Sequence, residues 1–229
     1  MADLRSVTRR IEDPWLQLLW ASRRWRFLTR LRLLARWKGT RLTLTAGPRL
    51  RVGRRVRVRV APRSTLELSF DRSCQIGDDV TLALFGGSLR FGPEVQLRQN
   101  VVVMLSGGAL SMGGSNMISF GAVLHVAESV TIDWGTAMAE YSSVADSSHY
   151  YSEPDVVLTS NTRTGPVRIW RNVFIAPRAS VGRGVTIGDH VIIGPSSVVT
   201  ADVPSASFVS GVPATRVRDV ELAWVPRTP

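Results

Sequence analysis

The chain has 229 residues, of which 44% are hydrophobic, which predicts one domain with a buried core and at most a small appendage. A single cysteine, Cys74, excludes an internal disulfide and a cysteine-based metal site, and it fits a reducing compartment. No stretch approaches the ~20 apolar residues that cross a bilayer, and arginines interrupt the apolar run near the N-terminus. We therefore expect neither a membrane span nor a secretory signal.

The net charge of +11 is concentrated at the N-terminal end. Residues 1–60 carry 17 Lys and Arg against 3 acidic residues, whereas residues 61–229 carry 12 basic and 15 acidic residues. The basic character therefore belongs to an N-terminal appendage, so the overall charge is no argument for a nucleic-acid-binding domain.

The first predicted element is a basic helix over residues 14–38, PWLQLLWASRRWRFLTRLRLLARWK. Asp13 and Pro14 suit an N-cap followed by the first helical position, and Gly39 ends the helix. Apolar residues recur mostly at spacings of three and four, which predicts an amphipathic helix. Two roles stay open for it: packing on the end of the domain or on another subunit, and peripheral contact with an anionic membrane surface.

Next, residues 49–60, RLRVGRRVRVRV, alternate arginine with valine, which predicts strands with a charged outer face. Such a face could bind the phosphates of a lipid-linked or nucleotide-linked glycan. Nucleic acid is the less favoured partner, because the region has no recognised nucleic-acid-binding motif. The predicted organisation is a basic helical segment over 1–48, a main domain over 49–215 and a C-terminal tail over 216–229.

The main domain has a six-residue repeat, which from residue 169 reads IWRNVF-IAPRAS-VGRGVT-IGDHVI-IGPSSV-VTADVP. An aliphatic residue opens each unit: Ile169, Ile175, Val181, Ile187, Ile193 and Val199. The same period runs upstream through Phe120, Val126, Ile132, Met138 and Val144, with weaker traces at Ile76, Phe91, Leu97, Val103, Met112 and Ile118. A period of six fits a short strand followed by a tight turn better than a helix or an ordinary β-sandwich. Stacking such units buries a continuous aliphatic column.

Residues 165–218 extend this repeat into a longer and more specific pattern. The segments IGDHVIIG, SSVVTADVP and GVPA resemble the C-terminal signature of hexapeptide-repeat acyltransferases of the polysaccharide and maltose O-acetyltransferase kind. The resemblance implies an all-β, left-handed parallel β-helix, with acetyl-CoA as acyl donor and no metal. It also implies a homotrimer with sites between adjacent subunits. The handedness rests on the resemblance alone, because a period of six does not fix it.

The repeat is interrupted after His149. Counting hexads forward from Phe120 places His149 last in its unit, and counting back from Ile169 leaves residues 150–162 outside the repeat. We expect those residues to loop out, with His149 at the base of the loop, and loops on a rigid scaffold are common sites of chemistry. A histidine hydrogen-bonded in an ordinary turn is the alternative. His125 and His190 fall elsewhere in the repeat and are expected on the surface.

The resemblance implies that His149 is a general base, which takes the proton of an acceptor hydroxyl as that hydroxyl attacks the thioester of acetyl-CoA directly. Such a histidine needs a partner that fixes its tautomer. Asp146 is the preferred partner because the family often has Asp there, with Glu140, Glu153, Asp155 or a backbone carbonyl as alternatives.

The resemblance also implies a set of CoA-binding residues, with three departures from the family. Phe174-Ile175-Ala176-Pro177 replaces a W-I-G-A/S segment, and Pro177 has no N–H to offer to the thioester oxygen, so another donor such as the Arg178 N–H is required. Ala201 stands where the family usually has a lysine that contacts CoA phosphates. Arg216 and Arg218 could make those phosphate contacts instead. Trp170 replaces a glycine, and its indole could stack on a sugar or adenine or cap the core. Pro195 and Thr200 complete the set.

The resemblance therefore implies an O-acetyltransferase that acts on a hydroxyl of a sugar, polysaccharide or glycolipid. A xenobiotic or amino-acid acetyltransferase of the same fold is one alternative, and a non-catalytic β-helix scaffold is another. The expected location is cytoplasmic, at the inner face of the membrane if residues 14–38 bind lipid.

Overall fold

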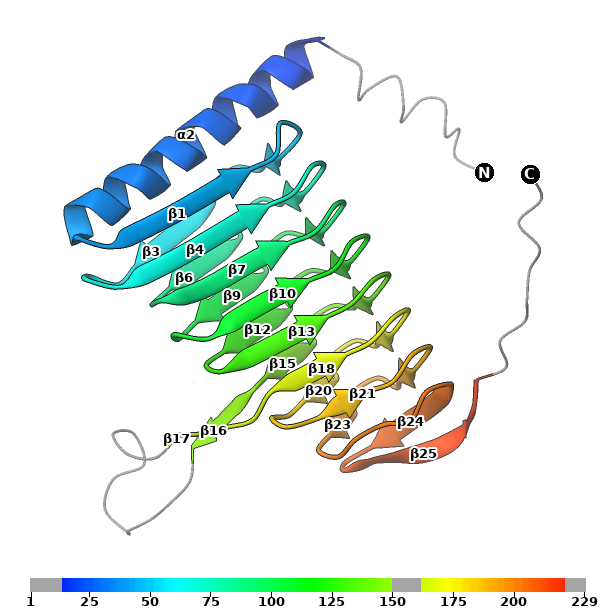
Figure 1. Ribbon diagram of the computed structural model, residues 1–229. Helices are drawn as coiled ribbons and strands as arrows, with labels where there is room; N and C mark the ends of the chain where they lie inside the picture. The colour runs from blue at the N-terminus through cyan, green and yellow to red at the C-terminus, as the bar shows by residue number, and fades with distance from the viewer. Residues whose placement is uncertain (1–13, 150–161, 221–229) are drawn as a thin grey trace.

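The computed structural model describes residues 14–149 and 162–220, and it confirms a parallel β-helix with one N-terminal helix (Figure 1). The chain visits three parallel sheets in turn, which we call faces A, B and C, and each round of three strands is one coil.

Face A contains β1 (Arg41–Ala46), β4 (Thr65–Phe70), β7 (Gly87–Phe91), β10 (Ala109–Met112), β13 (Ser129–Ile132), β18 (Val167–Ile169) and β21 (Thr186–Ile187). Face B contains β2 (Arg51–Val52), β5 (Gln75–Ile76), β8 (Gln96–Leu97), β11 (Met117–Ile118), β14 (Ala137–Met138), β19 (Phe174–Ile175), β22 (Ile192–Ile193), β24 (Ser207–Gly211) and β25 (Ala214–Asp219). Face C contains β3 (Arg57–Val60), β6 (Thr81–Leu84), β9 (Val102–Leu105), β12 (Val123–Val126), β15 (Ser143–Ala145), β20 (Ser180–Val181) and β23 (Val198–Val199). A short antiparallel pair, β16 (Ser147–His149) and β17 (Thr162–Thr164), lies outside these faces. We number the coils from the N-terminus, so that coil 5 is β13–β15, coil 6 is β18–β20 and coil 7 is β21–β23. The turns between faces are the AB, BC and CA corners.

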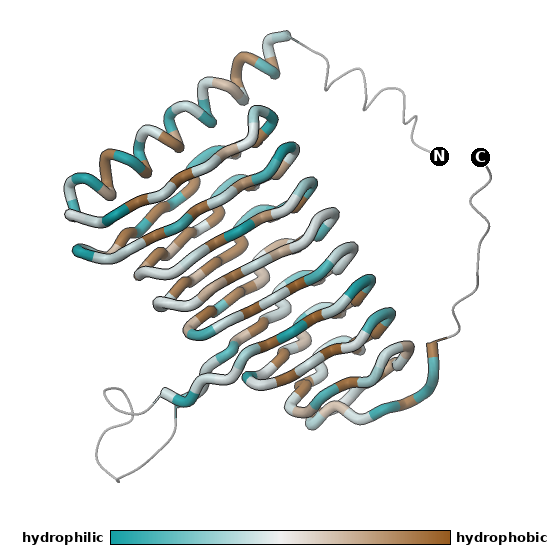
Figure 2. The backbone as a smooth tube through the Cα atoms, viewed as in Figure 1, coloured by the Kyte–Doolittle hydropathy of each residue, from teal (hydrophilic) through white to brown (hydrophobic). Residues whose placement is uncertain are grey.

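One aliphatic column fills the inside of the β-helix, because alternate strand residues point inward from all three faces. Figure 2 shows this alternation as brown segments that recur from coil to coil. Most inward residues of the central coils are completely buried, such as Leu82, Leu97 and Leu124. Cys74 belongs to this core, and burial raises the pKa of its thiol to about 11, so it is an inert packing residue.

Coil length explains where the predicted repeat is regular and where it fails. Thr186 pairs with Arg168 and follows it by 18 residues, which is three hexads, whereas Thr65 follows its partner Arg41 by 24 residues. Phe120, predicted to open a hexad in the core, is instead 41% exposed at a BC corner. The reason is that β12 has four residues, two more than the face C strands of coils 6 and 7. Counting back by six from Val126 therefore misses the inward position by two residues.

The predicted helix is present as α2 (Pro14–Lys38) and covers the first coil (Figure 1). Phe27, Leu31 and Ala35 are buried on this end of the column, and the Phe27 ring meets Phe70 edge-on at 6.2 Å between centroids. Gly39 then turns the chain with a positive φ of 64°.

Strands extend past two of the predicted boundaries. The β-helix begins with β1 at Arg41 rather than at residue 49, because RLTLTA already alternates outward and inward and pairs with β4. At the other end, residues 216–219 belong to β25, which pairs antiparallel with β24, so the tail begins later than residue 216. Among residues 14–149 and 162–220, no helix is long and apolar enough to cross a membrane.

Candidate active site

The coil stack is interrupted on the CA corner between coils 5 and 6, where the chain leaves face C and later returns to face A. The strands β16 and β17 form the base of this departure, with His149 opposite Thr162. The predicted loop over 150–162 therefore lies outside the described residues except for Thr162. His149 is placed as predicted, at the base of the excursion, and its side chain is exposed.

The next coil holds this base in position. Arg183, on the CA corner of coil 6, donates from Nε to the Ser148 hydroxyl at 2.9 Å. Ser148 precedes His149 and pairs across the base with Arg163. His149 is thus carried by a short, braced antiparallel pair that projects from a rigid scaffold.

Asp146 has a different environment from the one predicted. Its side chain is completely buried, and its two carboxylate oxygens accept the backbone N–H groups of Ala127 and Glu128 at 2.7 and 2.8 Å. Within the described residues there is no hydrogen bond between Asp146 and His149. The carboxylate is occupied by the turn of the preceding coil, so its geometry fits a structural task rather than the support of the imidazole.

The BC corner at the far edge of face C carries Pro177, Arg178 and Pro195. The Arg178 N–H, predicted to replace the missing N–H of Pro177, already donates to the Glu140 carbonyl at 2.9 Å. The Ala176 N–H next to it donates to the Ile193 carbonyl at 3.0 Å. Both amides belong to the coil ladder, so neither is free to act as an oxyanion donor in this structure.

Face C of coils 5–7 lies between these two corners and has small polar side chains. The Ser143 hydroxyl donates to the Ser180 hydroxyl at 2.9 Å, and these serines are register partners on adjacent strands. Thr200, just after β23, is exposed near the same face. We call this region, with His149 and Arg178 at its edges, the C-face site.

Four other predicted site residues lie elsewhere. Trp170 is at the AB corner and 47% exposed, and Phe174 points outward from face B and is 42% exposed. Arg216 and Arg218 lie on β25 at the end of face B, where Arg216 pairs with Asp219 and Arg218 stacks over Phe208 at 5.2 Å. One chain therefore does not bring the predicted residues together in a single site.

Residues 166–201, which form coils 6 and 7, match the family model described as bacterial transferase hexapeptide (six repeats). Over these two coils the chain is similar to hexapeptide-repeat transferases, and the relatives it matches are named as acetyltransferases. A "probable acetyltransferase" of Mycobacterium tuberculosis is 29% identical over 176 residues, which cover 76% of this chain and 51% of that protein. Galactoside O-acetyltransferase of Escherichia coli is 25% identical over 115 residues, which cover 44% of this chain and 57% of that protein. The chain thus spans about half the length of these curated relatives.

Solved structures of this hexapeptide-repeat architecture show the same fold. The polysialic-acid-specific acetyltransferase NeuO is 19% identical with a TM-score of 0.58, over 82% of this chain and 81% of that chain. AntD, an N-acyltransferase from Bacillus cereus in complex with dTDP and 3-hydroxybutyryl-CoA, is 15% identical with a TM-score of 0.52, over 77% of this chain and 83% of that chain. At these identities the similarity establishes the fold alone.

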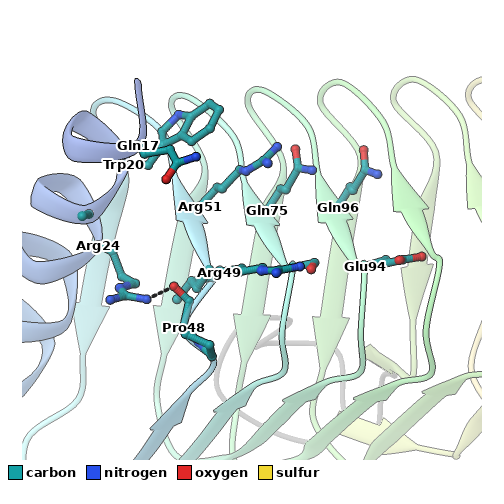
Figure 3. Close-up of a pocket in the computed structure, with 12 residues that line it drawn as sticks. Gln17, Trp20, Arg24, Pro48, Arg49, Arg51, Gln75, Glu94 and Gln96 are labelled. Carbon is teal, nitrogen blue, oxygen red and sulfur yellow. Dashed lines mark hydrogen bonds between the residues drawn. The ribbon is translucent and has the colours of Figure 1, made fainter. Parts of the chain in front are cut away.

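One hollow in the described part of the chain is lined by residues of α2 and the first coils and lies away from His149. It has a volume of about 770 Å³ and lies between α2 and face B of the first coils, where Trp20, Arg24, Arg49, Arg51, Gln75 and Gln96 line it (Figure 3). Its lining contains no histidine or cysteine, so the C-face site, which has His149 at its edge, is a better guide to catalysis than the volume of this hollow.

The arginine-rich stretch 49–60 forms β2, a turn and β3, as its alternation predicted. Two of its arginines are already paired, because Arg54 and Arg55 at the BC corner bind Asp78 and Asp79 of the next coil. A third, Arg51, stacks over the Trp20 ring at 4.3 Å. These contacts weaken the expectation that this stretch binds phosphate. Within the part of the chain that the structure describes, no three His, Cys, Asp or Glu side chains gather as a metal site would require.

Proposed function

We propose that this protein is an acetyl-CoA-dependent O-acetyltransferase acting on a hydroxyl of a sugar, polysaccharide or glycolipid. The observation that carries the proposal is the exposed His149, held at the one corner where the described coil stack opens, directly before the coils that match the family. The name of galactoside O-acetyltransferase supports a sugar hydroxyl, and the acetyl-group transfer named for both curated relatives supports the donor.

The proposed reaction is a direct transfer. His149 accepts the proton of the acceptor hydroxyl while its oxygen bonds to the thioester carbonyl carbon. The tetrahedral intermediate then collapses, the carbon–sulfur bond breaks, and the departing CoA thiolate takes the proton from the imidazolium. No acyl-enzyme forms, and the products are the acetyl ester and free CoA.

We propose that the donor lies across the C-face site, with its phosphates near basic side chains. The Arg178 guanidinium is exposed at the edge of this face and is available for such a contact, and Thr200 lies on the same side. Arg218 and Arg216, which the resemblance assigns to CoA phosphates, lie on face B, so in this proposal they serve a site shared with a neighbouring subunit.

We propose a homotrimer because the predicted CoA-binding residues are divided between face C and face B of one chain. Face B carries an outward row of apolar side chains in direct register on successive coils: Met117, Ala137, Phe174, Ile192 and Phe208. An apolar sheet face of this kind is typical of an interface between subunits. Three copies joined through it would place face B residues of one subunit beside the C-face site of the next.

The test is acetyl-CoA binding by calorimetry, followed by turnover with a panel of sugars, for the wild type, His149→Ala and His125→Ala. His125 is a matched control, because it is a second outward histidine, on β12 of face C, and its ring nitrogen Nε2 lies 3.3 Å from the Ser106 hydroxyl. We expect all three proteins to bind acetyl-CoA, and His149→Ala alone to lose roughly 10²–10⁴-fold in kcat. Equal turnover by the two variants would contradict the assignment of His149.

A non-catalytic scaffold is the second candidate, favoured by Pro177, by the occupied Arg178 N–H and by Ala201. It predicts that the correctly assembled wild type does not bind acetyl-CoA even at millimolar concentration. An acetyltransferase for xenobiotics or amino acids would bind acetyl-CoA but leave every sugar in the panel unmodified.

A further inference from the structure

The inner side of helix α2 is fixed to the first coil. Leu31 is completely buried and Phe27 and Ala35 nearly so, and Arg24 donates to the Pro48 carbonyl (Figure 3). Trp20, on the same side, lies against Arg51. The helix is therefore a rigid cap on one end of the β-helix, and its other side faces away from every coil (Figure 1).

That outer side is unusually apolar for a surface. At 100° per residue, the direction opposite the buried residues is occupied by large side chains with high exposed fractions: Trp15 76%, Leu18 62%, Leu19 47%, Trp25 68%, Leu33 62% and Trp37 76%. Trp25, Leu33 and Trp37 also border a shallow groove of about 390 Å³ with Arg26 and Arg30. Apolar residues thus lie on both sides of α2, so the helix is less strictly amphipathic than predicted.

The charge of this helix has one sign. Residues 14–38 contain six Arg and one Lys and no Asp or Glu. Arg26, Arg32 and Arg36 are exposed beside the tryptophans and leucines of the outer side. The surface therefore combines aromatic and aliphatic side chains with cations that have no acidic neighbour on their own helix.

We propose that the outer side of α2 docks on an anionic phospholipid surface. Tryptophan and leucine enter the boundary between headgroups and acyl chains, and flanking arginines bind lipid phosphates. A second copy of the helix would set arginine against arginine, which charge repulsion opposes. Nucleic-acid phosphates would pair with the arginines, but the central tryptophans and leucines would remain exposed to water.

The position of α2 suits this partner. Because the helix lies across the end of the β-helix, a flat bilayer can meet its whole length without touching the coils (Figure 1). The C-face site, at coils 5–7, would then face the aqueous side several coils away. The inference is independent of acyl transfer, since it uses no residue of that site.

The experiment is flotation of the full chain with vesicles of phosphatidylcholine alone or mixed with phosphatidylglycerol. Three variants are compared with the wild type: the apolar set Trp25→Ala, Leu33→Ala, Trp37→Ala; the charge set Arg26→Gln, Arg32→Gln, Arg36→Gln; and a control set Arg59→Gln, Arg72→Gln, Arg90→Gln. The control removes the same charge from exposed positions on the coils. Circular dichroism and thermal unfolding, measured in parallel, show that each variant is folded.

We expect the wild type to bind only the anionic vesicles and to dissociate as salt is added. The charge set should weaken binding on the order of 100-fold at low salt, and the apolar set should remove it at moderate salt, with the control close to wild type. Brominated lipid should quench wild-type tryptophan fluorescence more strongly than that of Trp25→Phe, Trp37→Phe. Absence of vesicle binding would overturn the proposal, as would an equal loss in the control set. Sedimentation that shows the protein dimerising through this side of α2, without binding vesicles, would also overturn the proposal.

Discussion

At the CA corner of coil 5, the Asp146 carboxylate accepts hydrogen bonds that the backbone of a neighbouring coil accepts elsewhere in the stack. Elsewhere in the stack, corner amides are bonded by the backbone of the neighbouring coil, as when Ser106 N–H donates to Val126 at 2.7 Å. The chain leaves this corner after Asp146, so the amides of Ala127 and Glu128 would have no partner there. The buried carboxylate accepts both, which allows the stack to open at His149 without unpaired polar groups.

Asp146→Ala is therefore expected to act on stability. Removing two buried acceptors should lower the free energy of unfolding by about 2–4 kcal/mol, with a smaller effect for Asp146→Asn, which keeps one oxygen. Denaturant unfolding measures this change. His149→Ala is the control and should unfold like the wild type, since the imidazole is exposed. A normally stable Asp146→Ala protein with lost turnover would instead support the imidazole-orienting role that the resemblance implied.

Two corner residues of the first coils show how charges join neighbouring elements. At the BC corner, Arg55 binds Asp79 through two contacts of 2.5 and 2.7 Å, and Arg54 contributes its N–H and its guanidinium to Asp78 at 2.6 and 3.0 Å. The hydrogen bond from the Arg55 guanidinium lowers the pKa of Asp79, and the Arg54 N–H lowers the pKa of Asp78. These pairs connect coil 1, which carries α2, to coil 2.

The sign of these pKa shifts predicts a pH dependence. A carboxylate whose pKa is lower in the folded state stabilises the fold above its unfolded pKa of ~3.9, and this contribution is lost as pH falls through the folded pKa. Asp79→Asn should therefore lower the melting temperature at pH 7, and the difference from wild type should shrink as the pH falls below the unfolded pKa of ~3.9. Glu67→Gln, at an exposed position on face A, is the control and should differ little at either pH. A difference that is constant with pH would show that packing, not ionisation, is responsible.

At this scale the sequence predicts regular elements well and irregular ones poorly. The hexads after residue 169 and the ends of α2 follow from local periodicity and capping, and counting between hexad blocks placed His149 at the base of a departure. The longer early coils shift the count, which is why Phe120 was misplaced. The hydrogen bonds of Asp146 and Arg178 could not be predicted for another reason: their partners, Ala127, Glu128 and Glu140, come from the preceding coil, and such cross-coil bonds are not visible in a linear motif.

Seen as a whole, the molecule has two apolar surfaces: the outer side of α2 at one end, and the row on face B that runs from coil 4 to β24. Trimer formation through face B would set the three β-helices side by side. If their axes run parallel, all three α2 helices lie at the same end, and three weak lipid contacts reinforce one another through a high effective concentration. Assembly, vesicle binding and catalysis would then depend on the same face.

Phe174→Arg tests this dependence. The change places a charge in the middle of the face B row, where burial against another subunit would desolvate it, so we expect the trimer to dissociate to monomers in light scattering. Phe85→Arg is the matched control, because Phe85 is similarly exposed, at 43% against 42%, but lies at a CA corner away from face B. The monomer should bind acetyl-CoA at least tenfold more weakly, because each site loses the residues of its neighbour, and it should bind anionic vesicles less tightly although α2 is unchanged. A wild type that is monomeric at micromolar concentration would refute the shared site. If the Phe174→Arg protein remains a trimer but binds acetyl-CoA more weakly, the result would instead support direct contact between Phe174 and the donor.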